Sequence, residues 1–253
     1  MRNLPPICPL LGVRLAVTDY ASAVALTRSW VDEGGVYAVA AANTHLVALG
    51  RHDRDFTASL AQFDLIVPDG MPLVWAMNRR GAGLQDRVYG PTLMLHALAQ
   101  PGVSHFLLGG SEELLEQLTA KLQERFPGLH IAGSYSPPFG EWPEAENARM
   151  FQKIAVSGAQ YIWVGLGCPK QEHWIARHKA ELPPGVYFAI GAAFAFHAGL
   201  VSQAPAWMQK RGLEWAYRLA AEPRRLWKRY VVYNTLFLYY LLLETISGAF
   251  RKP

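Results

Sequence analysis

The chain has 253 residues, of which 51% are hydrophobic and 17% are charged, and its formal net charge is +4. This balance excludes intrinsic disorder as the main state and allows a sizeable core. Its two cysteines, Cys8 and Cys168, are too few for a disulfide framework or a four-cysteine zinc site, and they suit a reducing compartment.

The first apolar stretch is interrupted by Pro5, Pro6 and Pro9, so we expect no signal peptide there. Beyond it, short apolar runs alternate with stretches of helical period. The runs that predict strands are 13–17, 36–42, 64–67, 104–108, 130–134, 161–165 and 186–190. Helices are predicted over 20–32, 112–126, 144–157 and 171–181. This alternation predicts an α/β fold with a Rossmann-like, mostly parallel sheet and helices on both of its faces.

The pattern changes after Ala204, where no further strand is evident and helices are predicted over 207–221 and 223–247. We therefore expect an α/β core over residues 1–204 and a C-terminal helical, membrane-associating appendage over 205–253. The appendage contains nine Lys/Arg against three Asp/Glu, whereas the core is slightly acidic. Its last apolar stretch, 231–250, includes five polar residues, which is too many for a confident spanning helix.

The basic segment 222–230 combines four cations with Trp227 and Tyr230. This composition is typical of a segment that binds an anionic membrane surface. A helix packed on the protein, with a solvated basic edge, is the alternative. Nucleic-acid binding is disfavoured, because the segment continues into a long apolar run rather than isolated stacking rings.

Small and polar residues follow several predicted strands directly. They are Asn43 and Thr44, Asp69 with Gly70, Gly109 with Gly110, the run 165–171, and Gly191. Ligands of open α/β sheets bind outside the carboxyl ends of the strands, so these residues form one candidate site.

Asp69 is the candidate general base, since a carboxylate at a strand end can take a proton from a substrate hydroxyl. Ordinary turn chemistry explains Pro68-Asp69-Gly70 equally simply. Gly109 and Gly110 open a helix whose N–H groups could receive a phosphate, although a tight turn alone would use the same glycines.

The run Gly165-Leu166-Gly167-Cys168-Pro169-Lys170-Gln171-Glu172 is the densest motif. Lys170 and Gln171 lie in the first turn of a predicted helix, and we expect them to contact a sugar or a phosphate. Arg87 could clamp a phosphate or lie on the surface.

Two other motifs are discounted. The Asp53-Arg54-Asp55 motif resembles a metal-binding D-x-D, but its segment can be read as a helix, in which residues i and i+2 do not share a face, and no strand directly precedes it. No histidine adjoins Cys168 in the sequence, which argues against a nucleophile.

Together and in order, these motifs resemble the WecG/TagA/CpsF family, glycosyltransferase family 26. The matching stretches run from Asn43 through 64–70, 86–90, 106–110, 165–172, 191–199 and 203–205 to 212–215, Arg218 and 222–225. Each is weak alone, but the ordered set is specific.

The resemblance implies transfer of a sugar from a UDP-sugar to a polyprenyl-diphosphate-linked sugar, with inversion and with neither a metal nor another cofactor. It implies that Asp69 is the base and that Asn43, Arg87 and Gln171 line the pocket. It also implies that Arg218 and Arg225 reach the lipid diphosphate. The expected place is the cytoplasmic face of the cell membrane, and a homo-oligomer is also compatible.

The chain departs from the family pattern at Ala41, where teichoic-acid members often carry Thr, and at Gln203, where many members carry Arg. These departures leave the donor sugar open among N-acetylmannosamine, glucose and uronic-acid types. Two other functions compete with this one, a nucleotide-dependent oxidoreductase and a non-enzymatic membrane-surface adaptor. The first would need a G-x-G-x-x-G turn that the chain lacks.

Overall fold

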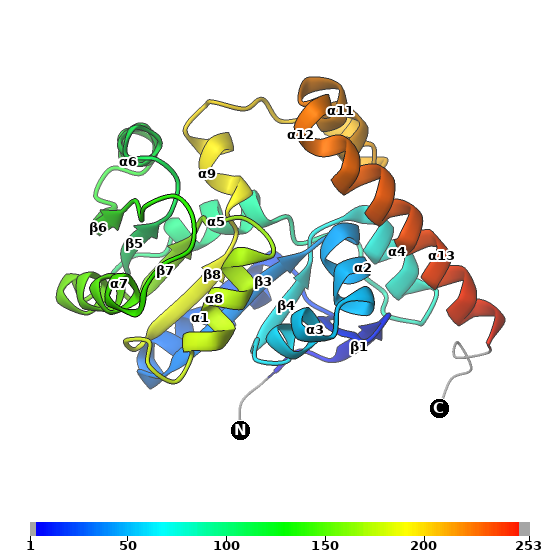
Figure 1. Cartoon of the computed structure of the whole chain (residues 1–253), viewed down its shortest axis with the longest axis horizontal. Coiled ribbons are helices and arrows are strands. Elements are labelled where there is room, and N and C mark those ends of the chain that lie inside the picture. The colour runs from blue at the N-terminus through cyan, green and yellow to red at the C-terminus, as the bar shows by residue number, and fades with distance from the viewer. Residues whose placement is uncertain (1–3, 248–253) are drawn as a thin grey trace.

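A six-stranded parallel sheet forms the centre of the computed structural model, which describes residues 4–247 apart from the side chains of Arg225 and Arg229 (Figure 1). The spatial order is β4-β3-β8-β7-β5-β6. The strands are β3 (Val36–Ala42), β4 (Leu65–Pro68), β5 (Ser104–Leu108), β6 (His130–Tyr135), β7 (Tyr161–Val164) and β8 (Gly185–Ala189). The α/β prediction is confirmed.

Helices cover both faces of the sheet, which explains why its inner strands are continuously apolar. Every residue of β7 and β8 is buried. Successive side chains enter opposite layers: Ala38 and Ala40 belong to one hydrophobic cluster, and Tyr37 and Val39 belong to the other.

The helices divide between these two layers. Those with buried residues in the first cluster are α2 (Thr44–His52), α3 (Arg54–Leu60), α4 (Met71–Asn78), α7 (Glu144–Ser157), α8 (Lys170–His178) and α13 (Tyr233–Ile246). The second cluster includes residues of α1 (Tyr20–Glu33), α5 (Gly90–Leu98), α6 (Glu112–Arg125) and α9 (Ala192–His197).

An antiparallel hairpin of β1 (Ile7–Leu10) and β2 (Val13–Ala16) precedes the sheet. The sequence predicted only the second of these strands, because the prolines made the first stretch look irregular. Pro9 is nevertheless compatible with a strand that has a free edge, where no N–H is required.

The C-terminal part is helical, as predicted, but the helix expected over 207–221 is wrong in one respect. It is broken into α10 (Ala206–Lys210) and α11 (Glu214–Ala221). Between them Gly212 has φ +68°, a left-handed conformation that ends a helix. The chain then continues through α12 (Pro223–Trp227) and the π-helical turn η1 (Lys228–Val232) into α13.

Helix α13 packs along α2 (Figure 1). Phe237 is buried in this contact, and Oγ1 of Thr44 donates a 2.6 Å hydrogen bond to Oδ1 of Asn234. Arg80 and Glu244 form an ion pair farther along. One side of the last helix is therefore packed on protein, and the division at residue 204 stays a prediction.

Candidate active site

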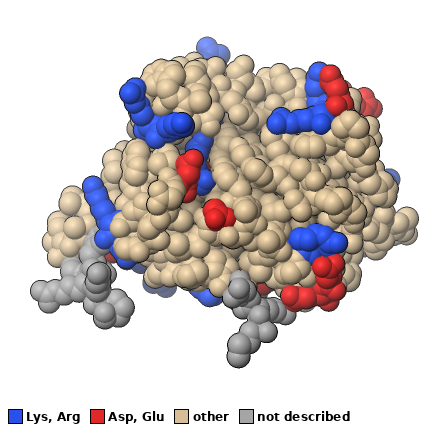
Figure 2. Space-filling view, turned by 180° about the vertical axis from the view of Figure 1, so that it is seen from behind, with Lys and Arg blue, Asp and Glu red and all other residues tan. Residues whose placement is uncertain are grey.

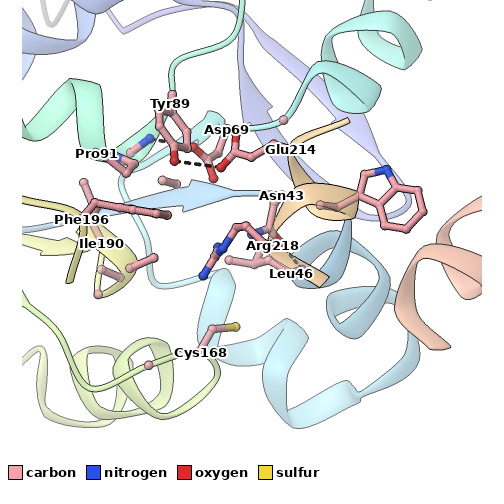
Figure 3. A pocket seen from close by; sticks show the side chains of 18 of the residues that line it. Asn43, Leu46, Asp69, Tyr89, Pro91, Cys168, Ile190, Phe196, Glu214 and Arg218 are labelled. Carbon is pink, nitrogen blue, oxygen red and sulfur yellow. Dashed lines mark hydrogen bonds between the residues drawn. The ribbon is translucent and has the colours of Figure 1, made fainter. Parts of the chain in front are cut away.

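A cavity of about 430 Å³ opens where β3, β4, β7 and β8 end, in the size range of small-molecule sites. Its walls come from segments spread between Ala41 and Tyr230, including the first of the C-terminal helices (Figure 3). The polar and charged residues that line it are Asn43, Thr44, Asp69, Arg87, Tyr89, Gln171, Glu172, Glu214, Arg218 and Tyr230. Most of the predicted site residues are thus brought together.

Asp69 follows the last residue of β4 directly, and its backbone N–H donates to the Ala42 carbonyl 2.7 Å away. Its Oδ1 accepts a 2.6 Å hydrogen bond from the N–H of Gly90. Burial raises the pKa of Asp69 to about 7, although Arg87 and the Gly90 N–H oppose this effect. A carboxylate with such a pKa can accept a proton and release it again near neutral pH.

Arg87 is buried beside Asp69, and it is not the surface residue of the alternative interpretation. Its Nη1 donates to the Asp69 carbonyl at 3.3 Å, and its guanidinium lies 4.1 Å from the centre of the Tyr89 ring. Helix α11 supplies the counter-charge, since Oε2 of Glu214 lies 2.8 Å from Nη2 of Arg87.

Asn43 and Thr44 lie at the beginning of α2. The Asn43 side chain caps this helix by accepting a 3.1 Å hydrogen bond from the N–H of Leu46. Because Oδ1 is engaged in the cap, the Asn43 amide N–H groups are the part suited to contact a ligand. The Thr44 hydroxyl is directed instead to Asn234.

Gln171 is buried against the turn that precedes its own helix. Its Oε1 accepts from the Gly167 N–H at 3.1 Å, and its Nε2 donates to Glu172 at 2.9 Å. A Cβ on Gly191 would lie 2.6 Å from Oε1 of Gln171 and 3.2 Å from the Cα of Gly165, so a larger residue here would displace the Gln171 amide.

Arg218 extends from α11 into the cavity (Figure 3). Its guanidinium lies 5.1 Å from the Phe196 ring centre, and its buried Nε makes no hydrogen bond among the described residues. A buried guanidinium N–H without such a bond suits an anionic ligand oxygen. The side chain of Arg225, the other predicted arginine, lies outside the described residues.

Three predicted residues are not in the cavity wall. Lys170 lies in a second, more open hollow, with its ammonium 3.5 Å from the Trp142 ring centre. The N–H of Gly109 donates to the Tyr135 carbonyl, and the Gly110 carbonyl accepts from a serine hydroxyl. The backbone groups of these two glycines thus form hydrogen bonds within the protein at the end of the sheet. This arrangement favours the alternative interpretation, in which the glycines form a tight turn.

Cys168 has a histidine partner that its sequence neighbours did not indicate. Its Sγ lies 3.8 Å from Nδ1 of His45, which is 123 positions away. The Asp53 carboxylate caps α3 by accepting from the N–H groups of Asp55 and Phe56. Neither aspartate lines the cavity that contains Asp69.

Tyr89 and Glu214 are the site residues that sequence reasoning missed. Both stand inside motifs already noted, 86–90 and 212–215, but nothing in those motifs distinguished them. In the structure they contact each other in the cavity wall, where the Tyr89 hydroxyl donates a 2.8 Å hydrogen bond to Oε1 of Glu214 (Figure 3).

Comparison with known proteins gives a family match. The family described as Glycosyl transferase WecG/TagA/CpsF matches residues 8–251. An N-acetylglucosaminyldiphosphoundecaprenol N-acetyl-beta-D-mannosaminyltransferase of Bacillus subtilis (strain 168) is 28% identical over 81% of this chain and 78% of its own length. The protein of the same description from Staphylococcus aureus (strain NCTC 8325 / PS 47) is 30% identical over 76% of this chain and 73% of its own.

Proposed function

Because the chain belongs to the Glycosyl transferase WecG/TagA/CpsF family, we propose that it moves a sugar from a UDP-sugar to a polyprenyl-diphosphate-linked sugar in cell-surface polysaccharide synthesis. The observation that carries this proposal is one carboxylate, Asp69, facing a cavity that also contains Arg87 and Arg218. The family assignment favours a transferase over the oxidoreductase and the adaptor.

The proposed reaction is a single displacement with inversion. The acceptor hydroxyl gives its proton to Asp69 while its oxygen bonds to the anomeric carbon of the donor. The bond from that carbon to the UDP oxygen breaks on the opposite face, and UDP leaves with the electron pair. Asp69 then returns the proton to solvent.

The departing diphosphate needs nearby positive groups, because negative charge develops on it in the transition state. Arg87 and Arg218 are the cations in the described cavity wall, and because Arg87 is held beside the base we assign Arg218 to the diphosphate. We assign Asn43 and Gln171 to orienting the sugars, since their amides lie in the same wall.

The acceptor class follows from the relatives, whose names specify N-acetylglucosaminyldiphosphoundecaprenol. The donor of this chain stays among N-acetylmannosamine, glucose and uronic-acid types. Incubation with each radiolabelled UDP-sugar and a short-chain polyprenyl-diphosphate N-acetylglucosamine tests the proposal. Label that enters the organic phase with one donor supports it, and no transfer with any donor contradicts it.

We also propose that the C-terminal helices bind the inner leaflet peripherally. Within residues 4–247, none of the helices combines the length and apolar character needed to cross a bilayer. Helix α13 nevertheless presents an exposed row, with Leu238 64%, Leu242 58% and Ile246 73% accessible. Lys and Arg side chains stand over the upper left of Figure 2, where α11 and α12 lie, and much of the surface seen there is uncharged.

Vesicle binding tests this arrangement. Replacing Leu238 and Leu242 by Asp should reduce cosedimentation with phosphatidylglycerol vesicles, because apolar burial and electrostatic attraction act together at such surfaces. Val156→Asp is the matched control, since Val156 is 81% exposed on α7, away from these helices. Equal loss in both variants would contradict the assignment of α13.

A further inference from the structure

Glu214 is a second carboxylate beside the proposed base, and the proposed reaction does not use it. It lies at the beginning of α11, and its side chain is 13% exposed. One oxygen lies 2.8 Å from Nη2 of Arg87 and the other accepts the 2.8 Å hydrogen bond from Tyr89. A single carboxylate therefore holds two residues of the core.

The same two residues are tied to the proposed base. Arg87 donates to the Asp69 carbonyl, and Gly90, which follows Tyr89, donates to the Asp69 carboxylate. Nη2 of Arg87 also donates a 2.9 Å hydrogen bond to Oε1 of Gln209 in α10. The C-terminal helices and the base are thus joined through Arg87 and the short segment that contains it.

We propose that Glu214 is a positioning residue, which docks α11 over the cavity and holds the guanidinium of Arg87 beside Asp69. The inference rests on the proposed function for its effect on catalysis. If Glu214 has this role, the C-terminal segment is a part of the site, because Arg87 and the cavity wall around Asp69 are complete only when α11 is docked.

The charges around Asp69 support this role. The ionisable groups that act on it are Arg87 from the loop before α5, and Glu214 and Arg218 from α11. Tyr20 of α1 and Tyr89 also interact with it. Burial is the main cause of its raised pKa, and the negative charge of Glu214 adds to it. Loss of the Glu214 charge and entry of solvent when α11 is no longer held both lower the pKa of Asp69, whereas a guanidinium of Arg87 that moves away raises it. We expect the two lowering effects to exceed the opposing one, because burial is the largest cause of the raised pKa.

Glu214→Gln is the principal test, because glutamine keeps the shape and can still accept from Tyr89 but has no charge. We expect the acid limb of the kcat/KM profile to move down by about one pH unit and kcat at pH 8 to fall about tenfold. Glu244→Gln is the matched control, since Glu244 also joins a C-terminal helix to a core arginine, Arg80, away from the cavity. Its acid limb should not move.

Hydrogen exchange supplies a second readout that needs no activity. Amides of residues 214–221 should exchange at least tenfold faster in Glu214→Gln than in the wild type, and Glu244→Gln should leave them unchanged. If Glu214→Gln does not fold, Tyr89→Phe removes one of the two contacts and should also speed this exchange. Unchanged exchange in the folded variants would refute the docking role.

The outcomes separate the two proposals. A wild type that transfers no sugar with any donor removes the proposed function, and the exchange measurement still decides whether Glu214 docks α11. An active wild type with a Glu214→Gln variant that loses activity, but keeps the acid limb in place, overturns the positioning role and leaves the function standing.

Discussion

The backbone N–H of Gly90 donates a 2.6 Å hydrogen bond to Oδ1 of Asp69 and so joins the first turn of α5 to the end of β4. A Cβ at Gly90 would lie 2.8 Å from Cγ2 of Ile190 and 3.1 Å from the Cβ of Ala41, so the approach depends on glycine. One carboxylate oxygen is held by this bond, and we expect the other to take the proton.

Asp69→Asn should reduce transfer by about 10²–10⁴-fold, because the general base is lost. The fold should persist, since the asparagine carbonyl can still accept from the Gly90 N–H. Turnover and circular dichroism, measured on the same preparation, check both statements. Near-normal turnover across the pH range would show that Asp69 is not the base.

Transfer should increase with pH and level off above about pH 7, where Asp69 becomes ionised. Below that value each pH unit should lower kcat/KM about tenfold, because only the ionised carboxylate accepts a proton. A profile of kcat/KM between pH 5 and 9 measures this limb. A flat profile over that range would contradict the assignment.

The same carboxyl makes stability depend on pH. Its pKa is about 7 in the folded chain, against an ordinary aspartate value of 3.8, so the folded state binds the proton more tightly than the unfolded state does. The contribution of Asp69 is therefore fully present below about pH 4 and is lost as the pH rises through 7. We expect Asp69→Asn to melt at a higher temperature than the wild type at pH 8, with the gap closing near pH 4. A gap that widens toward acid would reverse this sign.

Full activity should survive EDTA. Asp53 caps α3, and neither it nor Asp55 lines the cavity, so we assign the neutralisation of the leaving diphosphate to arginines. Transfer assayed with EDTA, and then with added Mn²⁺ or Mg²⁺, decides the matter. Activity lost to the chelator and restored by either ion would contradict the prediction.

Removing the chain from Gly212 onward should leave a folded core that no longer transfers sugar to lipid. Every described strand precedes the cut, but the deletion takes away Glu214, Arg218 and the α13 surface that covers α2. Circular dichroism and the organic-phase assay measure the two parts of this prediction. A truncated chain that stays fully active would contradict it.

Charge reversal at Arg218 and Arg225 separates two roles of the C-terminal arginines. If they act only in tethering, activity returns with a water-soluble acceptor analogue. If Arg218 contacts the diphosphate, as its place in the cavity wall suggests, activity stays lost with both acceptors.

The sheet was predictable because its strands are short apolar runs that end in small or polar residues, as in Val36–Ala42 before Asn43. Ligands of such sheets bind outside the carboxyl ends of the strands, and this expectation also placed Asp69, Asn43 and Gln171 in one cavity. Lys170 was expected in the same cavity but does not line it. It precedes Gln171 by one position, and successive residues of a helix point in different directions, so Lys170 lies against Trp142.

Contacts between distant segments were not predictable from local patterns. Cys168 lies near His45, and Glu214 lies near Tyr89, only because segments far apart in the sequence come together at the carboxyl ends of the strands. No periodicity in the sequence encodes such pairs. Similarly, the turn at Gly212 divides a stretch whose helical period continues on both sides.

Strand β8 lies between β3 and β7, and among the described strands it is the last to leave the ribosome. Without β8, the β4-β3 pair and the β7-β5-β6 group share no partner strand. During synthesis we expect β3 and β7 to leave unpaired the edges that β8 later covers, and unpaired strand edges can pair with other chains. The parallel pairing of Ala38 with Tyr187 closes a loop of about 150 residues, which makes this step slow relative to local folding. We expect the nascent chain to depend on chaperones over this interval.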